Sequence, residues 1–172
     1  PKKRFIIFGF TSFVWKYLID ELKKRKIFLN KNNSILIHGG GWKKMNNLNV
    51  TNNIFKKYAK MHLGSSNVFN YYGMIEQTGS VFLECKKGFF HCSIFSDILI
   101  RNSDLNLCKK GEIGLVQTMS LLPLSYPGHN LLTEDLGRLE GVDNCKCGNK
   151  GKYFSIIGRV PDSELRGCSD VT

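Results

Sequence analysis

Cysteine and histidine residues recur at close spacing in two separate segments of the chain. The first segment contains Cys85, His91 and Cys92, and the second contains Cys145 and Cys147. A closed tetrahedral Zn²⁺ site is often built from two ligands in each of two segments. The sequence therefore predicts a structural Zn²⁺ site. The alternative is that these are reduced cysteines that pack as small hydrophobic residues.

The predicted ligands are Cys85, His91, Cys145 and Cys147. His91 and Cys92 are neighbours in an expected strand, where successive side chains point to opposite faces, so only one of them can face the ion. We take His91 as the ligand and Cys92 as its substitute. One residue separates Cys145 from Cys147, which is tighter than the commoner zinc spacing.

Tyr72 and Glu76 lie in the run YYGMIE (71–76), at the end of an apolar segment. A tyrosine ring at a strand end can stack on a planar base. A carboxylate a few residues later can hold Mg²⁺, which prefers oxygen ligands. The alternative is a core tyrosine followed by a surface glutamate.

Asp135 follows Glu134 in the run LTEDLG (132–137). A carboxylate can accept hydrogen bonds from a ribose diol, as it does in dinucleotide sites. A Thr-Glu-Asp turn is, on its own, more often a solvated loop, so this run needs support from its context.

Glycines and a terminal cysteine complete the candidate residues. Gly39, Gly40 and Gly41 follow an apolar run, where glycines let a flat ligand or a phosphate approach the backbone, although a tight turn without a ligand accounts for them equally well. Cys168 follows Arg166, and a nearby cation favours the nucleophilic thiolate. A cysteine near a basic residue is usually inert.

The elements of the first half must position these residues. Apolar runs at 5–10, 34–38 and 68–72 are typical of buried strands, and helical patterns cover 11–26 and about 50–62. This alternation predicts a parallel sheet with flanking helices, which binds ligands at the carboxyl ends of its strands.

Each predicted helix carries an apolar stripe that should face the core. Thr11 or Ser12 can cap the start of the first helix, and Gly64 fits the carboxy-terminal cap of the second. The stripes are Phe13, Tyr17, Leu18 and Leu22 in the first helix, and Ile54, Tyr58 and Met61 in the second.

Short strand patterns at 81–85, 89–93, 97–101 and 112–118 follow in the second half, and the Lys-Lys-Gly sequence between the first two indicates a hairpin. The expected fold class is α/β, with a parallel sheet and flanking helices in the first half and mostly antiparallel β in the second. We expect a single compact chain with an αβ half at 1–80 and a β-rich half at 81–172.

Composition excludes several classes of protein. The net charge is +11, but the basic residues are spread along the chain, which is not the pattern of a nucleic-acid binder. The apolar runs are too short for a membrane span, and no secretory signal is evident. We expect a cytoplasmic protein with reduced thiols, and, since the chain lacks an initiator Met, a part of a longer protein.

Three ordered motifs resemble those of the adenylate-forming superfamily, which includes acyl-CoA ligases, luciferases and peptide-synthetase adenylation domains. The motifs are YGMIE (72–76), TEDL (133–136) and Gly158-Arg159, and the glycines 39–41 resemble the turn that lies along the adenine. Within the superfamily, the runs SYPGH (125–129), TEDLG (133–137) and ELRGC (164–168) are most similar to fatty acyl-protein synthetases, also called long-chain-fatty-acid–luciferin-component ligases.

The resemblance implies an ATP site with Mg²⁺, of which this chain supplies the carboxy-terminal part. It implies that Tyr72, beside Gly73, stacks on adenine and that Glu76 coordinates Mg²⁺. It also implies that Asp135 binds the ribose hydroxyls and that Arg159 contacts the ribose or a phosphate near the hinge.

The implied reaction is ATP-dependent activation of a fatty acid, or another carboxylic acid, to an acyl-adenylate. The acyl group then passes to Cys168 as a thioester, and an acyl-CoA reductase-type partner in a fatty acid reductase complex takes it onward. One alternative is an acyl- or aryl-CoA ligase of the phenylacetate-CoA ligase type, whose Cys-x-Cys-Gly element is similar. A second alternative is a zinc-stabilised binding module without catalysis.

The chain also departs from the superfamily pattern. Ile75 stands where the superfamily usually has a threonine that touches the α-phosphate, and Thr-Glu-Asp replaces the usual Thr-Gly-Asp. The phosphate loop is absent from these residues and is expected upstream, and the large mobile lid is missing or vestigial.

Overall fold

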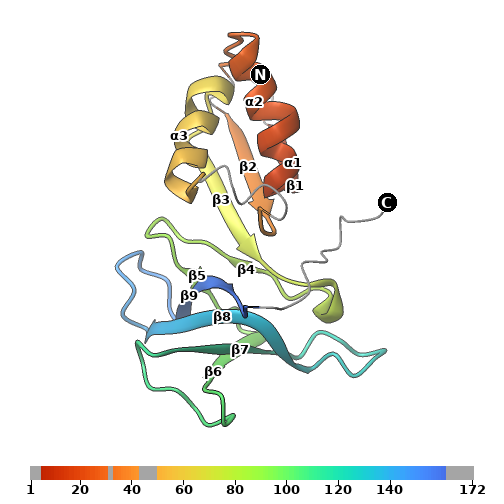
Figure 1. Ribbon diagram of the computed structural model, residues 1–172, viewed down its shortest axis with the longest axis vertical. Helices are drawn as coiled ribbons and strands as arrows, with labels where there is room; N and C mark the ends of the chain where they lie inside the picture. Colours follow the sequence, from red (N-terminus) through yellow and green to blue (C-terminus); the bar gives the residue numbers. More distant parts are fainter. Residues whose placement is uncertain (1–4, 31–32, 43–49, 162–172) are drawn as a thin grey trace. The chain divides into compact units, whose positions relative to one another are not determined.

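The computed structural model describes residues 5–30, 33–42 and 50–161 of the chain. The chain divides into two compact units, Pro1–Tyr71 and Tyr72–Thr172. Parallel strands with helices make up the first unit, and an antiparallel sheet makes up most of the second (Figure 1). The predicted α/β class is confirmed.

Three continuous apolar runs form the parallel sheet of the first unit. β1 (Phe5–Phe10) pairs with β2 (Ser34–Gly39), and β2 pairs with β3 (Asn67–Tyr72), both in parallel register. Each strand lies within one residue of its predicted bounds. β2 is largely buried, as expected for a strand of a parallel sheet. β1 was also expected to be buried, but most of its side chains are exposed in the structure, including Phe5, Ile6 and Phe8.

The first helical segment joins β1 to β2 and contains a π-helical stretch. It runs through α1 (Thr11–Phe13), η1 (Val14–Ile19) and α2 (Asp20–Lys24). At the end of η1 the backbone N–H of Asp20 donates to the carbonyl of Trp15, five residues back, which is the hydrogen-bond pattern of a π-helix.

The second helix, α3 (Asn52–Leu63), has a capping residue at each end. The side chain of Thr51 accepts a hydrogen bond from the backbone N–H of Ile54, at 3.3 Å. Gly64 ends the helix in the left-handed conformation, with a φ of 76°, as predicted.

The buried faces of both helices differ from the predicted stripes. Phe13, Tyr17, Ile54 and Met61 are all exposed. Leu22 is buried as predicted, and the predicted Leu18 and Tyr58 pack against the core. The helices and strands form one buried core cluster: Val14, Trp15, Ile19, Leu22, Leu36, Phe55, Ala59, Leu63 and Val68. In the first helical segment the buried side chains Val14, Trp15 and Ile19 are neighbours of the predicted Phe13, Tyr17 and Leu18. Residues 13–19 are apolar except for Lys16, so the sequence pattern does not single out one buried face.

His38 on β2 is buried in this core and makes a polar contact with the helical segment. Its Nδ1 lies 2.9 Å from the Thr11 hydroxyl, which donates to the Gly39 carbonyl at 3.0 Å. The hydroxyl has only one hydrogen, so Nδ1 carries the proton in its contact with Thr11. Thr11 therefore ties the start of the helix to β2 and does not cap the helix, contrary to the prediction.

The second unit contains an antiparallel sheet with the strand order β5-β9-β8-β7-β6. The elements are η3 (Ile75–Gln77), β4 (Phe82–Leu83), β5 (Phe90–His91), β6 (Ser96–Arg101), β7 (Ile113–Ser120), β8 (Asn130–Val142) and β9 (Lys152–Arg159). The last two strands were not predicted, although β8 is the longest element in the described chain.

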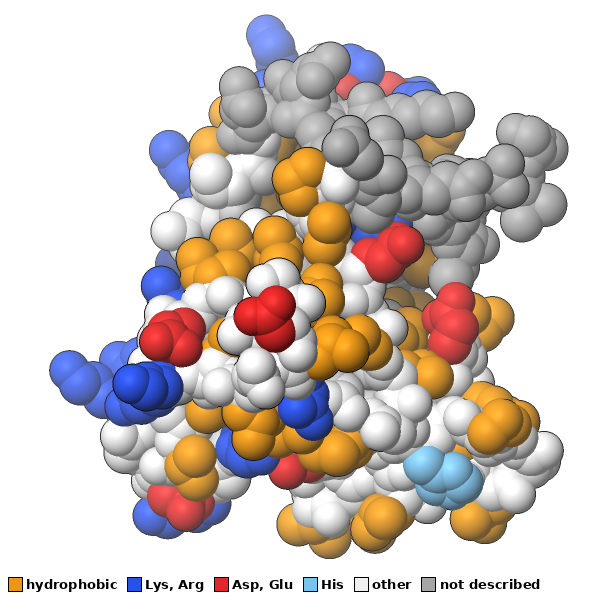
Figure 2. Space-filling view, turned by 60° about the horizontal axis from the view of Figure 1, so that its bottom comes forward, with side chains coloured by type: hydrophobic (Ala, Val, Ile, Leu, Met, Phe, Trp, Pro, Cys, Tyr) orange, Lys and Arg blue, Asp and Glu red, His pale blue; other side chains and the backbone are white. Residues whose placement is uncertain are grey.

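Aromatic and branched apolar side chains form the core of this unit. Phe82, Phe90, Ile98, Ile100, Val116 and Phe154 make up the buried cluster. Many other large apolar side chains stay exposed, and Figure 2 shows them in orange among charged groups on the face in view. In the described part of the chain, no helix is long and apolar enough to cross a membrane.

We predict that acid destabilises the protein through His38. Burial, together with the charge of Lys56, lowers the pKa of His38 from 6.5 to about 4. The unfolded chain therefore takes up a proton at a higher pH than the folded chain, and the stabilisation present above about pH 6.5 is lost as pH falls toward 4. The loss should reach about 3 kcal/mol in the free energy of unfolding, measured by urea titration at several pH values.

The variant His38→Asn keeps an N–H donor for Thr11 but does not titrate, so its unfolding free energy should depend less on pH over this range. His129→Asn, at an exposed histidine, is the matched control and should keep the wild-type pH dependence. An unchanged pH dependence in His38→Asn would contradict the assignment.

Candidate functional site

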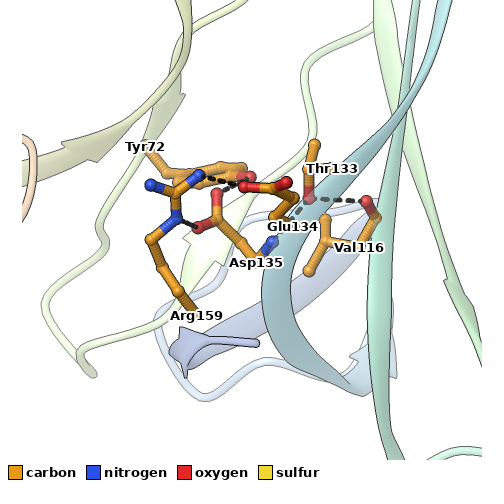
Figure 3. Close-up of polar contacts among 6 residues, drawn as sticks. All are labelled: Tyr72, Val116, Thr133, Glu134, Asp135 and Arg159. Carbon is orange, nitrogen blue, oxygen red and sulfur yellow. Dashed lines mark hydrogen bonds and ion pairs between the residues drawn. The ribbon is translucent and has the colours of Figure 1, made fainter. Parts of the chain in front are cut away.

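Polar side chains from three strands meet in the second unit. Tyr72 ends β3, Asp135 lies on β8 and Arg159 ends β9. The Tyr72 hydroxyl donates to Asp135 Oδ2 at 2.8 Å, and Arg159 Nε lies 3.5 Å from Asp135 Oδ1. Arg159 also donates through Nη2 to Glu134 Oε2 at 2.9 Å (Figure 3). Three residues whose roles the resemblance implies, Tyr72, Asp135 and Arg159, are thus in direct contact.

Strand pairing sets the distance between the carboxylate and the guanidinium. β8 pairs with β9 so that Asp135 lies directly opposite Arg159. The register then shifts between Leu136 and Gly137. A Cβ at Gly137 would lie 2.6 Å from the Val116 side chain, so only glycine fits at this crossing of β7, β8 and β9.

A bulge in β8 presents Asp135. Between the pairs Leu115–Leu136 and Gln117–Leu132, β7 advances two residues while β8 advances four. The Thr133 hydroxyl donates to the Val116 carbonyl at 2.8 Å and accepts from the Asp135 N–H at 3.1 Å (Figure 3). Thr133 therefore replaces ladder hydrogen bonds that the bulge removes. Bulges of this kind often re-aim side chains at functional sites.

The hydrogen bond between Tyr72 and Asp135 has a fixed direction. Burial raises the pKa of Tyr72 well above its usual range, and the negative charge of Asp135 raises it further. The phenol is therefore protonated at physiological pH and always donates to the carboxylate. Asp135 keeps acceptor capacity on its second oxygen, because a carboxylate has about four lone-pair positions.

The Tyr72 ring is packed on several sides by phenylalanines. Its centroid lies 6.0 Å from those of Phe82 and Phe154 and 6.1 Å from that of Phe90. The ring thus has a structural contact with the core as well as a polar one with Asp135. An adenine could stack only on the part of the Tyr72 ring that the three phenylalanines leave accessible.

Glu76 lies in η3, the turn that follows Gly73, and both residues are exposed. The next residue, Gln77, is buried, and its Nε2 donates to the Gly128 carbonyl at 2.9 Å. The backbone N–H of Thr78 donates to the Tyr126 hydroxyl at 2.8 Å. The YGMIE run is therefore held against the SYPGH run, about fifty residues later.

Gln77 and Tyr126 were not among the candidates from the sequence. Glu76 was a candidate because its carboxylate can bind a cation, whereas the side chain of the neighbouring Gln77 does not by itself indicate a function. Burial is what makes Gln77 important, and that depends on long-range packing with the loop around Gly128.

The glycine turn of the first unit has a packing role at two positions. A Cβ on Gly39 would lie 2.4 Å from the Tyr71 ring, and Gly40 adopts a φ of 76°, in the left-handed region. Gly41 is exposed. Tyr71 packing therefore accounts for Gly39 without a ligand, and nucleotide contact by this turn stays a prediction. Cys168 lies outside the described residues.

The four predicted zinc ligands come together in the second unit. One ligand atom from each of Cys85, His91, Cys145 and Cys147 lies within 4.8 Å of every other. Cys92 packs against the phenylalanine-rich core cluster and is not part of this group. The structure thus brings His91, rather than its substitute Cys92, into the group.

A sequence model described as acyl-protein synthetase, LuxE, matches residues 1–172. The chain belongs to the LuxE acyl-protein synthetase family. The predicted family is confirmed, and the comparison with curated proteins gave no match.

Solved structures with a similar fold include two CoA ligases and the ATP-bound protein MatB. A 2-hydroxyisobutyryl-CoA ligase, in an open conformation with 2-HIB-AMP and CoA, has a TM-score of 0.69 and 17% identity over 91% of this chain and 34% of its own. ATP-bound MatB from Rhodopseudomonas palustris has a TM-score of 0.58 and 14% identity, covering 90% of this chain and 30% of its own. A long-chain-fatty-acid-CoA ligase from Archaeoglobus fulgidus has a TM-score of 0.59 and 14% identity, covering 90% and 34%.

At these identities the similarity establishes the fold of this LuxE-family chain. The chain spans about a third of the length of these three proteins. The chain therefore matches one portion of a larger fold.

We predict that the bulge depends on the Thr133 hydroxyl. Thr133→Val keeps the shape of the side chain but leaves the Val116 carbonyl without its donor and the Asp135 N–H without its acceptor. The free energy of unfolding should fall by about 1–3 kcal/mol, measured by urea titration. Thr133→Ser retains the hydroxyl and should lose less than half as much. Equal losses in the two variants would show that the methyl group, not the hydroxyl, matters.

Proposed function

We propose that the protein to which this chain belongs uses ATP to convert a fatty carboxylic acid into an acyl-adenylate. It then transfers the acyl group to the thiol of Cys168. The observation that carries this proposal is the contact among Tyr72, Asp135 and Arg159 in a member of the acyl-protein synthetase family. The alternative is that Asp135 and Arg159 form a purely structural ion pair. Such a pair does not require a carboxylate at a bulge with further acceptor positions.

The chemistry begins with a poor electrophile. An oxygen of the fatty carboxylate attacks the α-phosphorus of ATP, the bond between the α- and β-phosphates breaks, and pyrophosphate leaves. The product is a mixed anhydride with a good leaving group. Positive groups near the phosphates stabilise the negative charge that develops in this step.

Asp135 and Arg159 fit the ribose side of the nucleotide. The side chains of Asp135 and Arg159 are 22% and 41% exposed, so a ligand can reach both. The carboxylate would accept hydrogen bonds from the ribose hydroxyls, while Tyr72 holds its other oxygen in place. The guanidinium of Arg159 would supply positive charge to the ribose or to a phosphate.

Glu76 is the residue that would hold Mg²⁺. It is an exposed carboxylate in η3, and carboxylate oxygen is a preferred ligand of this cation. When bound, Mg²⁺ would neutralise phosphate charge during the first step. Ile75 has no hydroxyl for the α-phosphate, so that contact must come from another residue.

The second step transfers the acyl group. The Cys168 thiolate attacks the carbonyl carbon of the acyl-adenylate, the bond from that carbon to the phosphate oxygen breaks, and AMP leaves. Arg166 precedes Cys168 by two residues in the sequence, and a cation near the thiol would favour the thiolate form. The thioester would then pass to an acyl-CoA reductase-type partner, and the cytoplasm is the setting proposed for this reaction.

The test of the first step is ATP–pyrophosphate exchange by the full-length protein with a panel of carboxylic acids. We expect exchange that depends on long-chain fatty acids. Asp135→Asn should lower kcat/KM for ATP by about ten- to a hundredfold, the effect of a hydrogen bond to a charged group. Asp97→Asn is the matched control, since Asp97 lies on the same sheet and pairs with Lys152.

Exchange that is equally fast in Asp135→Asn and Asp97→Asn would remove Asp135 from the ATP site. Exchange only with aryl acids would indicate a phenylacetate-type ligase. A folded protein that shows no exchange with any acid would favour a non-catalytic, zinc-stabilised binding module.

The second step is tested separately. Cys168→Ser should abolish hydroxylamine-sensitive labelling by radioactive fatty acid but leave pyrophosphate exchange unchanged, because the thiol acts only after adenylation. Cys108→Ser is the control and should be labelled like the wild type. Persistent labelling of Cys168→Ser would overturn the role of this residue, and CoA-dependent AMP release by that variant would favour an acyl-CoA ligase.

A further inference from the structure

Three thiols and one imidazole converge in the second unit, at a position that takes no part in the proposed ligase reaction. Cys85 follows β4, His91 lies on β5, and Cys145 and Cys147 lie in the turn between β8 and β9. Cys85, His91 and Cys145 are buried, and Cys147 is half-buried. Segments sixty residues apart in sequence thus place four metal-binding side chains together.

Two distances within this group are close to those between the ligands of a tetrahedral site. Cys85 Sγ lies 4.0 Å from Cys145 Sγ, and Cys147 Sγ lies 3.4 Å from His91 Nε2. Zn–S bonds of about 2.3 Å and Zn–N bonds of about 2.0–2.1 Å place tetrahedral ligands about 3.8 Å (S to S) and about 3.5 Å (S to N) apart. The sulfurs are about twice as far apart as in a disulfide, where S–S is about 2.05 Å.

The two turns that carry the cysteines are built alike. Gly88 N–H donates to the Cys85 carbonyl, and Gly148 N–H donates to the Cys145 carbonyl, at 2.9 and 3.0 Å. Both glycines have a left-handed φ, of 84° and 93°. This Cys-x-x-Gly turn closes the backbone tightly around each sulfur, in a conformation that glycine permits without strain.

Backbone N–H groups also point at two of the sulfurs. The N–H of Lys87 lies 3.4 Å from Cys85 Sγ, and the N–H of Asn149 lies 3.3 Å from Cys147 Sγ. In each case the donor is two residues after the cysteine. Such donors stabilise the negative charge of a thiolate, which is the form that binds metal.

The surroundings partly enclose the group and add positive charge beside it. Tyr153 packs over the group, with its ring nearly parallel to that of His91 at 5.5 Å, and its hydroxyl donates to Asn144 Oδ1. Lys87 and Lys146 lie in the adjoining hollow, on the two turns. Three thiolates and a neutral histidine around a divalent cation carry one net negative charge, which these lysines offset.

We propose that Cys85, His91, Cys145 and Cys147 bind one structural Zn²⁺ ion. Four protein ligands leave no open position for water or substrate, so the ion has no catalytic role. It would fasten the β4–β5 hairpin to the turn between β8 and β9. β5 has only two residues and pairs with β9 at two positions, so backbone hydrogen bonds alone hold it weakly.

The first test measures metal content in full-length protein purified under reducing conditions without added metal. We expect one zinc per chain by plasma mass spectrometry, and loss of most of that zinc in Cys145→Ser. Cys92→Ser is the matched control, because Cys92 neighbours His91 but packs in the other cluster, and it should keep its zinc. The measurement needs neither ATP nor fatty acid, so its outcome is independent of the proposed ligase activity.

A second measurement on unaltered protein guards against a variant that fails to fold. Removing metal with a chelator should lower the melting temperature, and adding Co²⁺ should restore it. The cobalt form should have the absorption bands of a tetrahedral site with thiolate-to-metal charge transfer. Protein without zinc that takes up neither Zn²⁺ nor Co²⁺, or protein that carries iron instead, would overturn the proposal.

Discussion

The bulge in β8 is the feature on which the geometry of the polar cluster depends. The Thr133 hydroxyl bonds to Val116 and to the Asp135 N–H, so one side chain takes over contacts that a regular ladder would have made. At the end of the bulge, Asp135 lies opposite Arg159 and accepts a hydrogen bond from the Tyr72 hydroxyl. In a regular strand, successive side chains alternate between the two faces and each residue keeps its ladder partner. The bulge takes Thr133, Glu134 and Asp135 out of this regular pairing.

The same pair of strands connects the two candidate sites of the second unit. β8 and β9 carry the Asp135–Arg159 pair toward one end and continue at the other into the turn with Cys145 and Cys147. The two ends of the strand pair carry chemically different side chains. Oxygen and guanidinium groups, which suit a nucleotide, lie at the first end, and sulfur and imidazole groups, which suit a soft divalent cation, lie at the second. In the proposed roles, one antiparallel ribbon would support nucleotide recognition at one end and a zinc cross-link at the other.

Prediction from the sequence was most successful for patterns that occur in few kinds of structure. The parallel strands were predicted because short, continuous apolar runs occur mainly in buried strands, and the cysteine–histidine group because those residues are sparse and closely spaced. β8 was not predicted, and the Thr-Glu-Asp run within it was interpreted as a turn; polar residues and glycines interrupt the alternation that would have indicated a strand. The predicted helix faces were right at Leu22 and wrong at Phe13 and Tyr17, because residues 13–19 are apolar on more than one side and the pattern does not single out the buried face. Gln77 was missed because only its distant partner, the Gly128 carbonyl, makes it important.

The donor that holds Asp135 is a phenol whose pKa is raised, so this hydrogen bond does not titrate in the physiological range. The carboxylate is thus oriented before any ligand arrives. Immobilising a rotamer-rich side chain on binding costs about 0.5–1.5 kcal/mol of free energy. Asp135 is already immobilised by the folding of the second unit, so binding would not carry this cost. In the proposed role, Tyr72 would raise the affinity for a nucleotide through the entropy of a neighbouring side chain, in addition to any contact that its own ring makes.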